Sequence, residues 1–146
     1  MKIAIACDHG AYEYKEMIKE MLLSQGHEVK DFGTNSTASM DYPDVAFPCA
    51  QAVANGEFER GIVMCGTGIG VSITANKVKG IRCALCNDPL SARLTREHND
   101  TNMLAFGQRI IGSELAKEIV NVWLNTPFSN GERHKMRIQK VMDIEK

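Results

Sequence analysis

Short apolar runs alternate with stretches of helical periodicity along almost the whole chain, and this alternation constrains the fold more than any other feature. Four runs are nearly continuously apolar, as in strands buried on both faces, and they cover residues 3–7, 61–65, 81–86 and 103–106. A half-polar run at 27–32 predicts a fifth strand. The pattern predicts an α/β fold, a three-layer Rossmann-like sandwich with a five-stranded parallel sheet.

Capping residues place helices between these strands. Gln25-Gly26 and Asn55-Gly56 follow helical apolar spacing and are typical C-terminal caps, whereas Asn87-Asp88-Pro89 is a typical helix start. Ser113 can cap a further helix, which we expect to stop at Thr126-Pro127. The expected helices include residues 17–22, 45–53, 71–77, 90–97, 115–123 and 132–145.

Composition limits the classes of protein to which the chain can belong. With 146 residues and 44% hydrophobic residues, the size is that of a single domain spanning 1–146. Seventeen basic and eighteen acidic residues leave a net charge of -1, which argues against nucleic acid or an anionic membrane as partner. The first apolar run is too short for a signal peptide or membrane span, and five cysteines form an odd set. We therefore expect reduced thiols and a cytoplasmic protein.

Reactive or polar residues follow three of the predicted strands. They are Cys7-Asp8-His9-Gly10, the glycine loop Cys65-Gly66-Thr67-Gly68-Ile69-Gly70, and Phe106-Gly107-Gln108-Arg109. Ligands of parallel sheets bind beyond the carboxyl ends of the strands. We therefore expect the three segments to converge on one site.

The glycine loop has three possible roles: a tight structural turn, a dinucleotide site or an anion cradle. Asp88 lies near the position of a ribose-binding acid, but the dinucleotide fingerprint would need glycine where the chain has Val71. In an anion cradle, backbone N–H groups and the positive end of a helix would face one point. A thiol at such a helix start is more easily ionised, so Cys65 is a candidate base or nucleophile.

Cys83 and Cys86 form the only C-x-x-C pair, a spacing that can indicate a redox or metal site. Odd spacing within a strand sends the two side chains to opposite faces of the sheet. No second cysteine or histidine pair completes a zinc site. We therefore expect buried, unreactive thiols and no metal.

His98 and two arginines are further candidates. His98 ends a predicted helix in a polar stretch, where it could be a surface residue or a proton donor near neutral pH. Arg133 and Arg137 share one face of the last helix, which could be a solvated surface or, with Arg109, a phosphate clamp. His27 and His134 have no comparable setting.

The chain resembles the family that contains ribose-5-phosphate isomerase type B and the galactose-6-phosphate isomerase subunits. The segments that carry the resemblance are Cys-Asp-His at 7–9, Asp-Tyr-Pro at 41–43, Cys-Gly-Thr-Gly-Ile-Gly at 65–70, Ala-Asn-Lys at 75–77, His-Asn-Asp-Thr-Asn at 98–102, Ala-Phe-Gly at 105–107 and Arg-His at 133–134. The resemblance implies a cofactor-independent aldose-ketose isomerase that works as a homodimer or dimer of dimers. It also implies sites shared between subunits and a C-terminal helix used in dimerisation.

The resemblance also implies a role for each site residue. Cys65 would move the proton between C1 and C2, and His98 would open the sugar ring with Asp8 as its proton-accepting counterpart. Thr67 would help to position the substrate beside the loop amides that stabilise an enediolate. The other implied substrate contacts are His9, Tyr42, Gly66, Gly68, Ile69, Gly70, Asn99, Arg109, Arg133 and Arg137.

Two alternatives stay open on the sequence. The same chemistry could act on a hexose 6-phosphate such as allose or galactose 6-phosphate, because pocket depth cannot be deduced from one sequence. A non-catalytic module could instead bind a phosphosugar with the same loop. Such a module would need neither a reactive thiol nor an acid at separate strand ends.

Overall fold

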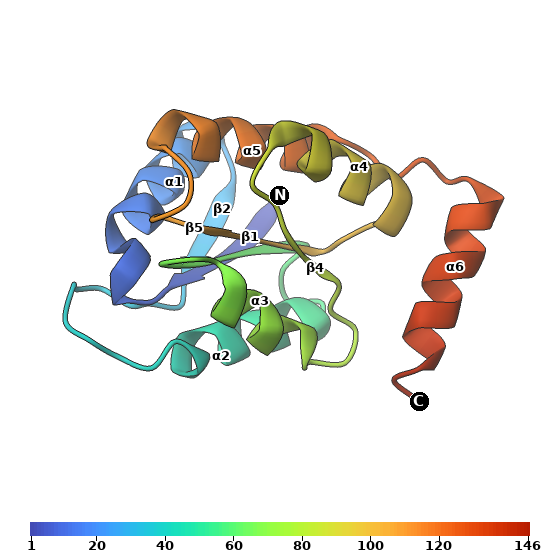
Figure 1. The fold of residues 1–146 in the computed structure, drawn as a ribbon, viewed down its shortest axis with the longest axis horizontal. Helices are drawn as coiled ribbons and strands as arrows, with labels where there is room; N and C mark the ends of the chain where they lie inside the picture. Colours follow the sequence, from blue (N-terminus) through green and yellow to red (C-terminus); the bar gives the residue numbers. More distant parts are fainter.

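The computed structural model describes residues 1–146 and contains one five-stranded parallel sheet, which confirms the predicted fold class. The strands are ordered β2-β1-β3-β5-β4 across the sheet (Figure 1). Their bounds are Lys2–Cys7 for β1, Glu28–Asp31 for β2, Arg60–Cys65 for β3, Cys83–Leu85 for β4 and Met103–Gly107 for β5.

Helices cover both faces of the sheet. The α-helices are α1 (Tyr12–Ser24), α2 (Pro43–Ala54), α3 (Ile69–Asn76), α4 (Pro89–Asn99), α5 (Ser113–Asn125) and α6 (Glu132–Asp143), and a short 3-10 helix, η1, spans His9–Ala11. In Figure 1, α1, α4 and α5 lie on one side of the sheet, with α2 and α3 on the other.

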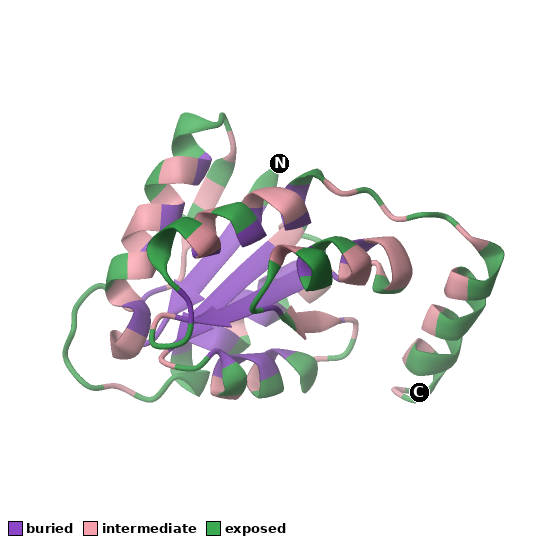
Figure 2. Ribbon diagram, turned by 45° about the horizontal axis from the view of Figure 1, so that its top comes forward, coloured by how far each residue is buried: buried purple, intermediate pink, exposed green.

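Two apolar clusters, one on each face, hold these layers together. Ile3 and Ile5 of β1 pack into the cluster that includes Trp123 of α5, whereas Ala4 and Ala6 pack into the cluster that includes Cys49 of α2. Alternate strand residues point to opposite faces, so each central strand contributes to both clusters. The buried strands form the centre of the molecule in Figure 2.

Two elements differ from the prediction. The strand expected at 81–86 is only Cys83–Leu85, and it is a partly exposed edge strand, not one buried on both faces. It starts late because the Arg82 amide donates to the Asn102 side chain (2.8 Å), not to a neighbouring strand. Helix α3 begins at Ile69, two residues before the expected start, because Gly68 adopts the left-handed conformation that ends the loop.

The cysteine pair behaves as expected. Cys83 packs against the cluster beneath α2 and α3, whereas Cys86 belongs to the opposite cluster. Burial raises the pKa of both thiols, that of Cys86 to about 11. Both therefore stay protonated near neutral pH.

Helix α6 stands beside the rest of the chain and contains no buried residue (Figures 1 and 2). Its C-terminal end is held by the Gly80 amide, which donates to the Glu145 carboxylate (2.9 Å), and by Arg82, which contacts the Met142 sulfur (3.3 Å). None of the helices is both long and apolar enough to span a membrane.

Candidate active site

The three polar strand ends meet at one edge of the sheet. Strands β1, β3 and β5 are neighbours, and Cys65 is in register with Gly107. The Arg109 amide donates to the Gly66 carbonyl (2.9 Å), and the Gln108 amide donates to the Cys65 carbonyl (3.1 Å). These bonds fasten the glycine loop to the end of β5.

Cys65 lies at the base of this loop. Its side chain is buried, and its sulfur accepts a hydrogen bond from the Gly68 amide (3.1 Å). The loop therefore places a backbone hydrogen-bond donor directly against the sulfur of Cys65.

Three loop amides remain available for a ligand. The amides of Gly66, Thr67 and Gly70 donate no hydrogen bond within the chain, whereas the Ile69 amide donates to the Thr67 hydroxyl (3.2 Å). Free amides beside a helix N-terminus stabilise an oxygen that carries negative charge. The loop has the geometry of an anion cradle.

Asp8, His9 and Tyr42 surround the loop from the β1 side. The Asp8 carboxylate accepts a hydrogen bond from the Gly10 amide (2.8 Å). Gly10 in turn packs closely on the loop, because a Cβ built on it would lie 3.2 Å from the Gly66 nitrogen. The Met40 amide donates to Nδ1 of His9 (3.2 Å). A Cβ built on Gly70 would lie 2.6 Å from the Tyr42 ring, so glycine is needed where this ring covers the loop.

Arg109 covers the loop from the other side. A Cβ built on Gly66 would lie 3.3 Å from Cδ and 3.4 Å from Nε of the Arg109 side chain. The guanidinium group is exposed. Of the three predicted phosphate ligands, only Arg109 lies at this edge.

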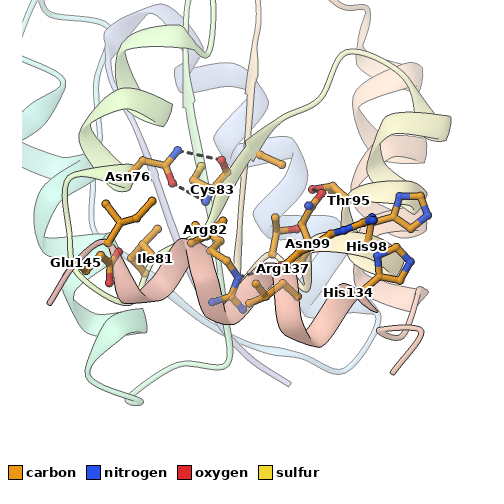
Figure 3. Close-up of a pocket in the computed structure, with 15 residues that line it drawn as sticks. Asn76, Ile81, Arg82, Cys83, Thr95, His98, Asn99, His134, Arg137 and Glu145 are labelled. Carbon is orange, nitrogen blue, oxygen red and sulfur yellow. Dashed lines mark hydrogen bonds between the residues drawn. The ribbon is translucent and has the colours of Figure 1, made fainter. Parts of the chain in front are cut away.

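His98, Asn99 and Arg137 line a different pocket, of about 670 Å³, between α4, α6 and β4 (Figure 3). No glycine-loop residue lines it. Arg133 is exposed on α6 outside the lining. The two groups of predicted site residues are thus apart in this chain.

Strand register explains the separation. Cys65 is level with Gly107 at the carboxyl end of β5, whereas α4 returns the chain to the amino end of that strand at Met103. The Asn99 carbonyl accepts from Arg82, which immediately precedes β4 (2.9 Å). Because strand β5 alone spans about 13 Å, His98 cannot reach Cys65 within one chain.

The chain matches the sequence profile of the family described as Ribose/Galactose Isomerase over residues 3–141. The chain belongs to this family. It is 50% identical over 144 residues to ribose-5-phosphate isomerase B of Escherichia coli strain K12, covering 99% of this chain and 96% of that protein. It is 45% identical over 132 residues to D-erythrulose-4-phosphate isomerase of Pectobacterium atrosepticum, covering 90% of this chain and 87% of that protein.

A solved structure agrees with these relationships. Ribose-5-phosphate isomerase B of Clostridium thermocellum matches with a TM-score of 0.97 and 52% identity, covering 99% of this chain and 97% of that one. The chain is therefore a sugar phosphate isomerase.

One residue of this isomerase had no expected role. His134 of α6 stacks on His98 of α4, with ring centroids 4.6 Å apart and an interplanar angle of 11° (Figure 3). Desolvation, followed by the charges of His98, Arg133 and Arg137, lowers the pKa of His134. Its position next to Arg133 was the only sequence signal, since the stacking depends on how two distant helices meet.

The contact between β5 and the glycine loop gives a first prediction for this isomerase. A Cβ on Gly107 would lie 2.3 Å from the Thr67 carbonyl carbon, so Gly107→Ala must displace the loop. We expect turnover to fall by roughly 10²-fold and stability to fall by about 1–3 kcal/mol. Steady-state kinetics and denaturant unfolding measure both quantities.

Gly112→Ala is the matched control, because a Cβ there meets nothing within 4 Å. It should leave both quantities unchanged. Equal activity of Gly107→Ala and the unaltered enzyme would show that the close packing of the loop on β5 is not needed for catalysis.

Proposed function

We propose that this isomerase interconverts ribose 5-phosphate and ribulose 5-phosphate through an enediolate. The observation that supports this most strongly is the Cys65 sulfur, which accepts a hydrogen bond from the loop and lies at the same strand edge as three free amides. A base beside an anion cradle is what proton transfer next to a carbonyl requires. The names of the relatives from E. coli and C. thermocellum support the pentose phosphate as substrate.

Cys65 performs the proton transfer in this proposal. Its thiolate removes the proton from C2 of the open-chain aldose, and the C1 carbonyl oxygen becomes the oxyanion of the enediolate. Sulfur returns the proton to C1 while the O2 proton is transferred to the O1 oxyanion, so that C2 becomes the carbonyl of the ketose. Sulfur ends the cycle as the thiolate with which it began.

The glycine loop stabilises the enediolate. The Gly66 and Thr67 amides face no internal acceptor, so they donate to the oxygen on which charge develops. The Thr67 hydroxyl, which accepts from the Ile69 amide, helps to position the substrate. Removing one such donor typically costs about 10²–10³ in turnover.

A second copy of the chain completes the site. In each chain His98, Asn99 and Arg137 line a pocket that no residue of the Cys65 loop lines. Exposed apolar side chains suited to an interface lie on α6, at Met136 and Val141, and around the glycine loop, at Ile69 and Ile73. In a homodimer or dimer of dimers, α6 would take part in dimerisation.

The partner residues open the ring and bind the phosphate. His98 of the partner subunit donates a proton to the ring oxygen, and Asp8 accepts the proton of the C1 hydroxyl. Arginine forms two-pronged hydrogen bonds with phosphate. Arg109, with the partner subunit's Arg133 and the partner subunit's Arg137, binds this group, while His9 and the partner subunit's Asn99 contact the sugar.

The substrate is tested by incubating the chelator-treated protein with ribose 5-phosphate, erythrose 4-phosphate, allose 6-phosphate and galactose 6-phosphate. Ketose formation is measured for each. We expect the highest kcat/KM with ribose 5-phosphate. A higher value with a hexose 6-phosphate would replace the proposed substrate, and absence of turnover on all four would reject the proposed function.

Replacing His98 tests the ring-opening step. With ribose 5-phosphate, which is mostly a closed ring, His98→Asn should lower kcat/KM by about 10²–10⁴-fold, the usual contribution of an acid-base group. With 4-deoxyribose 5-phosphate, which lacks the hydroxyl that closes the furanose, the loss should stay below about tenfold. Coupled assays of ketose formation measure both, and equal losses would assign His98 another role.

A further inference from the structure

Lys15 of α1 is fully buried, which is unusual for a lysine. Its ammonium group contacts Asp31 at 2.9 Å and Glu16 at 3.3 Å. It also donates to the Thr34 carbonyl and to Oδ1 of Asn35, the latter at 3.1 Å. The side chain therefore joins α1 to the segment that follows β2.

This ammonium group remains charged. Burial alone would lower the pKa of Lys15, but the hydrogen bond and the charge of Asp31 outweigh burial and raise it above the ordinary value. A permanently charged lysine is not a proton donor or acceptor near neutral pH. Its role must come from the contacts that it makes.

Those contacts lie next to the end of β1, which is followed by His9 in η1. The Cys7 amide donates to the Gly33 carbonyl (2.7 Å), and the Thr34 amide donates to the Cys7 carbonyl (2.6 Å). The segment that Lys15 holds is thus paired with the end of β1, two residues before His9. The same segment continues to Met40, whose amide donates to Nδ1 of His9 (3.2 Å).

A hydrogen bond donated to Nδ1 decides which nitrogen of His9 carries the proton. A backbone amide can only donate, so Nδ1 must present a lone pair and the proton of the neutral ring resides on Nε2. His9 in this tautomer is a hydrogen-bond donor through Nε2. That is the form suited to an oxygen of a sugar phosphate.

We propose that Lys15 is a positioning residue for His9: by fixing residues 31–35, it keeps the Met40 amide on Nδ1 and so holds His9 as an Nε2–H donor. The contact between His9 and substrate rests on the proposed function, whereas the tautomer does not. Lys15 makes no hydrogen bond or ion pair with the loop around Cys65, and its contacts with Glu16 and the Tyr12 ring lie within α1 itself.

The test is the tautomer of His9, observed by ¹⁵N NMR of histidine-labelled protein near neutral pH without substrate. The unaltered protein should give Nε2–H shifts for His9. Lys15→Met should shift them toward a mixture of tautomers. Lys19→Met is the matched control. Lys19 also contacts Asp31 (3.2 Å), but it is partly exposed and makes no hydrogen bond to residues 34–35. The His9 signals of Lys19→Met should therefore be those of the unaltered protein.

Two milder variants keep the test valid if Lys15→Met does not fold. Asn35→Ala removes one contact of Lys15 and keeps the Asp31 pair, so it should shift the tautomer in the same direction by less. Met40→Pro removes the donating amide and should give the largest shift toward the mixture of tautomers. An unchanged His9 tautomer in folded Lys15→Met, or in both milder variants, would overturn the proposal.

Kinetics then separate positioning from a general loss of structure. Because the lost interaction is one hydrogen bond to substrate, Lys15→Met should raise KM for ribose 5-phosphate by about tenfold and change kcat by less than about threefold. A fall in kcat at unchanged KM would overturn the positioning role. Absence of turnover in the unaltered protein would reject the proposed function while the NMR result stood.

Discussion

Cys65→Ala is expected to lower kcat for ribose 5-phosphate by at least about 10³-fold, since it removes the group that carries the proton between C1 and C2. The affinity for a non-reacting sugar phosphate should change little, because the loop amides and Arg109 remain. Steady-state kinetics and calorimetric binding measure the two quantities.

Stability should change little in the same variant. Cys65 contributes a single buried sulfur and accepts one hydrogen bond, so the loss should be about 1–2 kcal/mol, observed as a modest fall in Tm. Cys49→Ala is the matched control, since it also removes a buried thiol but lies in α2, outside both halves of the site. Near-normal turnover of folded Cys65→Ala would exclude Cys65 as the base.

The second large effect is recovery of activity when two inactive variants are combined. Cys65→Ala and His98→Asn should each abolish or nearly abolish turnover of ribose 5-phosphate. If the site takes Cys65 from one chain and His98 from the other, a mixed dimer contains one intact site and one doubly altered site. Random assortment should then restore about a quarter of the unaltered activity, because half of the dimers are mixed and each has one good site.

Co-expression of the two variants, followed by assay of the purified mixture, measures this recovery. Cys65→Ala combined with Asp8→Asn is the control, because both changes lie on the same half of the site and no mixed dimer contains an intact one. If the first mixture remained as inactive as its components, the shared site would be rejected. Recovery in both mixtures would place Asp8 with the partner's half.

A good part of the fold and of one half of the site could be predicted from the sequence. Three apolar runs predicted β1, β3 and β5, since a strand buried on both faces must be apolar at successive positions. A half-polar run predicted β2, and a fourth apolar run predicted the shorter edge strand β4. Residues that follow β1, β3 and β5 had to meet at one edge, because parallel strands end on the same side of the sheet. The close packing of the loop also depends on residue identity, since a Cβ at Gly107 or Gly70 would overlap its neighbours.

The sequence therefore determined the layers, the strand edge and the placement of Cys65 within the loop. Only the tertiary structure showed that His98 lies far from Cys65, near the amino end of β5. The distance between the two residues is set by the course of α4 back along the sheet and not by the number of residues between them. The tertiary structure alone showed the stacking of His134 on His98 and the buried contacts of Lys15. These contacts join elements distant in the chain, and their geometry depends on how the helices pack against the finished sheet.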